Sequence, residues 1–277
     1  MITDASLYPL LRRMQRATVV WLTSWWRLLQ FAVLILSQGF TPGSYRKDNR
    51  NRLACQLVLS TAPNLLWFSI LAALISLVII RIVVVTAFSY GLSRYALEMV
   101  VRVLVLELIP LTVALFVALR TTLPAGVEFA QKRLADAAAA PAGSTGGHTD
   151  PAEALRTEFF PRAAAGMFAV WMLGAVSCVL TLVLTYLVIY GFTPYGLPGY
   201  TRVVGQIFNP SVALILVLKI AFFSFAVGLI PLASSYYDAA ANPFVLRFRA
   251  THGLADMVRM FSVILLIEVA SLMGNYY

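Results

Sequence analysis

Residues 64–89 read NLLWFSILAALISLVIIRIVVVTAFS and contain a single charged side chain, that of Arg81. A transmembrane helix needs about 20 consecutive, mostly apolar residues to cross the hydrocarbon core of a bilayer. This stretch exceeds that length, and a soluble protein must keep most of its surface polar or charged to stay dispersed. The sequence therefore predicts a membrane-spanning helix here.

The same apolar character recurs along the rest of the chain. Four more segments of this kind follow at about 97–119, 163–191, 208–235 and 257–275. Composition agrees, because 60% of the residues are hydrophobic and only 12% are charged, about half the usual charged share of a soluble globular protein. These values exclude a soluble enzyme, a disordered tail and a nucleic-acid reader. They predict an all-α polytopic membrane protein with five transmembrane helices.

The first apolar run begins at residue 55 and is too long for a simple span. A proline removes a backbone donor and its ring crowds the preceding turn, so a helix can break there. We expect Pro63 and Asn64 to divide 55–89 into a short elbow helix and a span of about 64–89.

The region before the first span combines positive charge with aromatic and aliphatic side chains. Residues 7–38 hold four arginines among tryptophans, leucines and valines, a pattern typical of a helix that lies in the membrane interface. A transmembrane span is the alternative, although 28–38 alone is too short to cross. We expect residues 1–54 to form an amphipathic interfacial helix and a basic cytoplasmic turn, and residues 55–277 to form a five-helix transmembrane domain.

The net charge of +9 serves as a signal of topology rather than of nucleic-acid binding. Eight Lys and Arg residues lie in 1–54, five in 120–162 and three in 236–260, whereas 90–98 and 192–206 hold one each. Cytoplasmic loops carry an excess of Lys and Arg, so the first three regions are expected on the cytoplasmic side. The N-terminus is then cytoplasmic and the C-terminus lies outside.

The cytoplasmic connection at about 121–161 lacks the pattern of a nucleotide site. Its middle, 135–147, is rich in Ala, Gly, Pro and Ser, as flexible linkers are. The glycines there precede His148 rather than the lysine that a P-loop requires. His148 and His252 are the only histidines, and neither has cysteines or paired carboxylates at metal-ligand spacing. We therefore expect no enzymatic activity, no cofactor and no metal site in this chain.

Five charged side chains fall inside the predicted spans: Arg81, Arg102, Glu107, Lys219 and Glu268. Each costs roughly 2.5–3.5 kcal/mol at a helix centre, so each should face a partner or a wet cavity. For Glu107 and Lys219 two interpretations stay open: an opposite-charge pair or shared polar cavity, and hydrogen bonds that only stabilise helix packing. For Arg81, Arg102 and Glu268 we prefer the interpretation in which the charge only stabilises helix packing. Each of these residues is nearer the membrane interface, or could extend its polar end toward it.

Short motifs follow the apolar segments in a fixed order. They are Leu106-Glu107-Leu108-Ile109-Pro110, Ala118-Leu119-Arg120 with Glu128, Asp150-Pro151, Pro161-Arg162, Gly166, Lys219, Tyr237-Asp238, Arg249-Ala250-Thr251, Glu268 and Gly274-Asn275. In this order, residues 55–277 resemble the MlaE/YrbE family, the permease subunits of MCE-associated lipid-transport ABC systems. Leu106 replaces the arginine of the family's R-E-L-G-P motif, and Leu119 and Thr122 replace the glycines of A-G-R-x-G. The linker at 129–149 replaces a usually helical stretch near the expected ATPase contact.

The resemblance implies an MlaE-like permease: an interfacial helix plus five transmembrane helices, working as a homodimer in the bacterial inner membrane. It implies two cytoplasmic ATPase subunits and a periplasmic MCE-domain assembly as partners, with phospholipid or a similar lipid as cargo. ATP hydrolysis would take place in the partner chain.

The resemblance also implies two groups of site residues. A lipid-binding cavity is implied at Glu107, Lys219 and Tyr90, where the lysine would attract the lipid phosphate. Coupling to the ATPase is implied at Arg120, Glu128 and Asp150.

Two other function classes remain as alternatives. A proton-coupled secondary transporter of a small amphiphile would use Glu107 or Glu268, although transporters of that class usually show paired repeats and none is visible in this sequence. A membrane scaffold that transports nothing is the second alternative.

Overall fold

The computed structural model describes residues 7–41, 47–92, 95–128, 131, 155–241 and 250–276. Every regular element within these ranges is helical. In chain order they are α1 (Leu7–Phe40), α2 (Lys47–Ser89), α3 (Ala96–Val100), η4 (Val101–Leu108), α4 (Ile109–Val117), η5 (Ala118–Thr122), η6 (Leu155–Phe159), α7 (Phe160–Tyr190), η7 (Pro194–Gly196), α8 (Leu197–Ile207), α9 (Pro210–Ala241) and α10 (Ala250–Tyr276).

Five helices in the described ranges are long and apolar enough to cross a membrane, which confirms the predicted fold class. They are Leu53–Ser89, Ala96–Glu128, Leu155–Tyr190, Pro210–Ala233 and Asp256–Asn275. The second of these joins α3, η4, α4 and η5 into one continuous rod. This rod runs past the expected end at 119, and the third span begins before the expected 163. The 135–147 linker lies outside the described residues.

The expected break at Pro63 is wrong, because α2 continues through the proline from Lys47 to Ser89. Membrane helices tolerate proline where side chains and neighbouring helices satisfy the backbone groups around it. The carbonyl that Pro63 leaves without a donor is that of Leu59. Next to it, the Asn64 side-chain nitrogen donates to the Ser60 carbonyl at 3.0 Å and to Thr121 Oγ1 at 3.2 Å. The side chain that follows the proline thus braces its own helix and ties it to η5.

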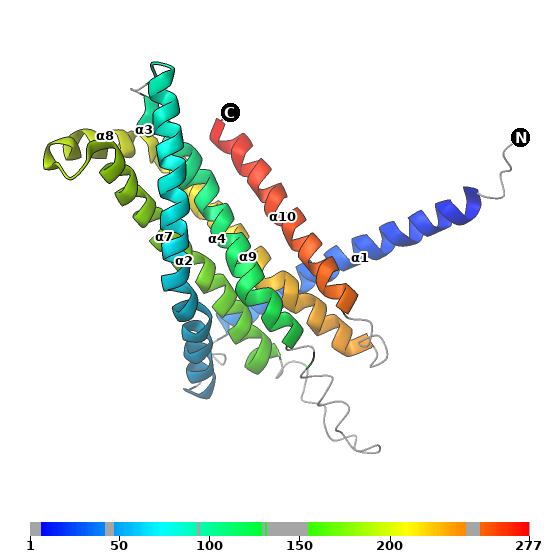
Figure 1. Cartoon of the computed structure of the whole chain (residues 1–277). Helices are drawn as coiled ribbons and strands as arrows, with labels where there is room; N and C mark the ends of the chain where they lie inside the picture. The colour runs from blue at the N-terminus through cyan, green and yellow to red at the C-terminus, as the bar shows by residue number, and fades with distance from the viewer. Residues whose placement is uncertain are drawn as a thin grey trace, which may run out of the picture.

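The long helices form a bundle around the second span (Figure 1). There α2 and α7 run side by side, α1 crosses the other helices at a steep angle, and α10 stands apart from α2 and α7. Of the apolar stretch of each span, 61% is buried in the second span, against 28% in the first and third spans and 22% in the span of α10. The second span is therefore the centre of the bundle and α10 lies at its periphery.

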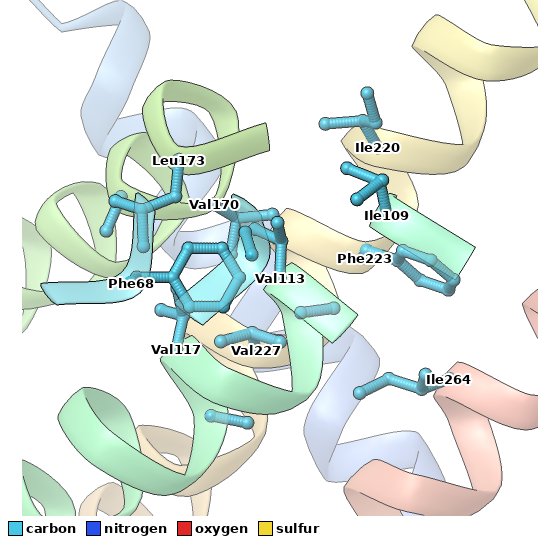
Figure 2. Close-up of a cluster of buried hydrophobic side chains, with 14 of the residues drawn as sticks. Phe68, Ile109, Val113, Val117, Val170, Leu173, Ile220, Phe223, Val227 and Ile264 are labelled. Carbon is cyan, nitrogen blue, oxygen red and sulfur yellow. The ribbon is translucent and has the colours of Figure 1, made fainter. Parts of the chain in front are cut away.

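The main hydrophobic core is contributed by α2, the whole second span (α3, η4, α4 and η5), α7, α9 and α10, and Figure 2 shows its side chains gathered around α4. Val113 of α4, Phe223 of α9 and Ile264 of α10 are fully buried. Lipid is as apolar as these side chains, so close packing rather than the hydrophobic effect holds such helices together. Ile264 is the residue that α10 contributes to the part of the core labelled in Figure 2.

A group of three aromatic rings anchors α1 to the bundle. The ring of Phe31 lies 6.0 Å from that of Phe159 and 5.5 Å from that of Tyr236, and the last two rings are 5.4 Å apart. Edge-on and tilted contacts at these distances add to the stabilisation from burial. They join α1 to η6 and α9.

A second aromatic group lies at the other end of the bundle, which carries α3, α8 and the C-terminus of α10 (Figure 1) and is called the α8 end below. Tyr186, Tyr190 and Tyr200 pack together there, with ring centroids 5.2 to 6.2 Å apart. The Tyr200 hydroxyl donates to the Leu182 carbonyl at 2.8 Å. Burial raises the pKa of Tyr200 to about 12, so this hydroxyl keeps its proton and fixes α8 to α7.

Candidate functional site

The candidate site is a cluster of charged side chains centred on Lys219 of α9, which is 2% exposed. Its ammonium donates to the Glu107 carboxylate of η4 and to the Leu106 carbonyl, the latter at 3.2 Å. Glu268 Oε2 of α10 lies 2.9 Å from the same nitrogen. Three helices that are far apart in the sequence thus meet at one buried lysine.

Pro110 cannot give the Leu106 carbonyl the donor that an α-helix would supply. In an α-helix the N–H of residue 110 would donate to the carbonyl four residues earlier, which belongs to Leu106. Proline has no N–H, so this carbonyl lacks its usual partner. The Lys219 ammonium takes that place.

The helix that carries Glu107 is locally wider than an α-helix. Val101–Leu108 is a π-helix, and after it the N–H of Ile109 bonds to the carbonyl of Leu104, five residues back. Short π-helical turns inside α-helices are often found at functional sites. Here the turn coincides with a buried carboxylate, as Glu107 is 8% exposed.

The C-terminal part of α10 supplies the polar side of the cluster. Glu268, Ser271 and Asn275 are spaced by three and four residues and therefore lie on one face of the helix. The Asn275 side-chain nitrogen donates to Glu107 Oε1 at 3.0 Å. Leu266 on the outer face is 70% exposed. The polar face of α10 thus turns toward η4 and α9, and its apolar face turns outward.

The cluster is unequal in charge, with one ammonium and two carboxylates if all three groups are ionised. Removing one partner of a buried ion pair typically costs about 3–5 kcal/mol, because the remaining charge loses its compensation. The three charged groups therefore depend on one another. We expect the position of α10 to depend on this cluster.

The other residues predicted for the lipid-binding group and the spans lie elsewhere. Tyr90 follows α2 at the α8 end and is 76% exposed, so the structure does not bring it to Glu107 and Lys219. Arg81 is exposed on α2. Arg102 pairs with Glu98 on its own helix, with 3.0 Å between Nε and Oε1.

The residues predicted for ATPase coupling lie toward the opposite end of the second span. Arg120 on η5 and Glu128 at the end of the span are both exposed. Asp150 lies outside the described residues. The described structure therefore places two of the three on one exposed helix end.

Sequence reasoning did not place Glu268, Ser271 and Asn275 beside Glu107. Glu268 is 9% exposed and sits inside the cluster rather than reaching toward an interface. The spacing of the three residues could have indicated a polar helix face. The proline four residues after Leu106 could have indicated a carbonyl in need of a donor.

Within the described ranges, no three or more His, Cys, Asp or Glu side chains are grouped so that they could hold a metal ion. The cluster around Lys219 can instead hold or exchange a proton, form hydrogen bonds, or bind a charged group. These are the properties of a ligand-binding site or of an ion-pair contact that holds helices together.

Comparison with known protein families gives one match. The family described as Permease MlaE matches residues 53–273, a range that includes all five candidate spans except the last two residues of the fifth. Glu107, Lys219 and Glu268 fall within the matched range. No curated protein matches the chain significantly.

Proposed function

The chain belongs to the MlaE permease family and is a multi-pass membrane permease subunit, and we propose that its cargo is a phospholipid or a similar lipid. In this proposal two copies form a homodimer in the bacterial inner membrane. A separate cytoplasmic ATPase powers transfer between that membrane and a periplasmic MCE protein.

The observation that carries the proposal is the buried charged cluster inside an otherwise apolar bundle. A lipid has a polar head and apolar tails, so a protein that moves it needs an apolar surface for the tails and a few buried polar groups for the head. Glu107 and Lys219 supply such groups, and Glu268 adds a third. Tyr90, exposed after α2, would contact lipid at the membrane interface.

The proposed orientation follows from the distribution of Lys and Arg. The N-terminus is cytoplasmic and the C-terminus periplasmic, which puts the α8 end on the periplasmic side. Arg120 and Glu128 then lie on the cytoplasmic side, where an ATPase subunit would dock. Asp150 belongs to the same proposed contact.

A second candidate function is proton-coupled transport by the chain alone. The observation that favours it is the pair of carboxylates that share one lysine, since such a pair can take up and release a proton. Substrate uptake that follows a proton gradient in vesicles holding only this chain would support it over the ATPase-driven proposal.

The proposal is tested by reconstituting the chain with its ATPase and MCE partners and measuring ATP-dependent lipid transfer. The double variant Glu107→Ala with Lys219→Ala should reduce transfer by at least tenfold. A matched control is Glu98→Ala with Arg102→Ala, which removes a more exposed ion pair from the same span. Unchanged transfer in the first variant would favour a non-transporting scaffold role for the cluster.

A further inference from the structure

The Lys219 ammonium is surrounded by oxygens of the protein itself. A lysine ammonium carries three N–H donors and no acceptor. Three oxygens surround it here: the Leu106 carbonyl, Glu107 Oε2 and Glu268 Oε2. A phosphate would have to displace one of these oxygens, and it would approach a cluster whose formal charge is −1 when all three groups are ionised.

Several acceptor atoms around the lysine, in contrast, have no hydrogen-bond donor among the described residues. Glu268 Oε2 lies close to the ammonium but outside hydrogen-bond alignment. Asn275 Oδ1 and Ser271 Oγ are shielded from solvent and have no hydrogen-bond partner among the described residues. Ser271 is 8% exposed, and its spacing from Glu268 and Asn275 puts it on the polar face of α10.

A buried acceptor without a donor is costly, about 1–3 kcal/mol for a neutral group and more for a charged one. The cluster therefore has acceptors for one more donor, and its charge favours a cation. A primary ammonium meets both needs, because it brings one positive charge and three N–H groups. A quaternary ammonium brings the charge without any N–H, and a glycerol headgroup brings hydroxyls without a cation.

We propose that the cluster of Glu107, Lys219, Glu268, Ser271 and Asn275 binds the primary ammonium of an aminophospholipid headgroup. This inference rests on the proposed function and names the class of lipid that the permease prefers. The ammonium lies beside Glu268 and Asn275 and makes the cluster neutral. Lys219 holds the two carboxylates in place and does not contact the lipid phosphate.

The depth of the cluster suits a headgroup that enters from the α8 end. Glu268 lies eight residues before Tyr276, the end of α10, and at 1.5 Å per residue this is about 12 Å along the helix. A lipid at the outer leaflet would reach this depth by a short inward movement. The exposed apolar side chains of α10 would accompany its tails.

The test uses the purified full-length chain incubated with an equimolar mixture of three phospholipids that share the same acyl chains. Their headgroups are ethanolamine, choline and glycerol, and the retained lipids are measured by native mass spectrometry. We expect the ethanolamine lipid to be retained about tenfold over the choline lipid, the size of a hydrogen bond to a charged group. The matched control Glu98→Gln, a carboxylate outside the cluster, should keep this preference.

Two variants test the cluster itself. Glu268→Gln removes the excess charge and should abolish the preference for ethanolamine. Ser271→Ala changes no charge, preserves helix propensity, and should reduce the preference severalfold, so the test does not depend on Glu268→Gln folding. Equal retention of all three lipids, preferential retention of the glycerol lipid, or an unchanged preference in the Ser271→Ala variant would overturn the inference.

Transfer assays with the reconstituted complex separate this inference from the proposed function. ATP-dependent transfer that is faster for the ethanolamine lipid supports both. Transfer at equal rates for all headgroups overturns only the headgroup preference. The absence of ATP-dependent transfer of any lipid contradicts the proposed function itself.

Discussion

Two helix contacts in this bundle use polar side chains in opposite ways. Between α2 and α7, Ser76 Oγ and Thr181 Oγ1 form a buried hydrogen bond of 3.0 Å, and within α7 Thr185 Oγ1 donates to the Thr181 carbonyl at 2.8 Å. Between η4, α9 and α10 the groups are charged, and some acceptors have no donor in the described structure. Neutral hydroxyls suffice to hold two helices together. A contact that is charged and incompletely paired therefore indicates a role beyond helix packing, such as ligand binding.

The contrast extends to how each helix is held. The α2 and α7 helices make the most extensive helix contact in the described structure, whereas α10 packs mainly against α9. A helix with few packing contacts depends more on each polar contact. We therefore expect the charged cluster to control the position of α10, while the hydroxyl pair makes a small contribution to a contact that packing already secures.

The largest expected effect is that of Lys219→Met, which keeps the length of the side chain and removes its charge. The two carboxylates then lose their shared cation, and the Leu106 carbonyl loses its donor. We expect a loss of about 3–5 kcal/mol in the free energy of unfolding, measured by denaturant titration in mixed micelles. Arg102→Met, in a more exposed pair, should cost under about 1 kcal/mol. Equal losses would remove the distinction between the two contacts.

A smaller effect on the free energy of unfolding separates the hydrogen bond of Lys219 to the Leu106 carbonyl from its ion pairs with Glu107 and Glu268. Pro110→Ala restores the backbone N–H at position 110, which in an α-helical register bonds to the Leu106 carbonyl. In that background Lys219→Met should cost about 1 kcal/mol less than in the unmodified chain, the value of one hydrogen bond. The measurement is a double-mutant cycle on the free energy of unfolding. If the effects of the two substitutions on the free energy of unfolding are strictly additive, Lys219 does not replace the hydrogen bond that Pro110 cannot make.

The smallest effect is expected at the contact between α2 and α7. Replacing Ser76 by Ala and Thr181 by Val, singly and together, removes the hydroxyl pair. Hydrogen bonds between membrane helices average about 0.6 kcal/mol in such cycles, and we expect a coupling energy of that size from the unfolding titrations. Lipid transfer should stay unchanged. A coupling as large as the loss at Lys219 would contradict the comparison drawn above.

Much of the fold could be predicted because its decisive signal is local. The run at 64–89 must leave water whatever surrounds it, and only a helix satisfies its backbone in lipid. The break predicted at Pro63 was wrong for a reason that is also local but depends on side-chain geometry. Asn64 bonds back to Ser60 and across to Thr121 beside the proline, and a rule based on proline alone does not include such bonds.

The candidate site was predictable only in part. The cost of a buried charge singled out Glu107 and Lys219 before any neighbour was known. The same rule did not separate Glu268 from Arg81, because distance along a span does not reveal which way a side chain faces. In the structure Glu268 is buried beside Lys219, and Arg81 is exposed on α2.

The sequence by itself determined that this chain is a helical membrane protein with five spans, since span length and hydropathy are properties of consecutive residues. It also marked the charges that need partners. Only the tertiary structure decided which partners they have, because Leu106, Lys219 and Glu268 come from helices that meet by packing. It likewise showed that three protein oxygens surround the lysine while acceptors on α10 have no hydrogen-bond donor among the described residues. Both facts depend on distances between helices.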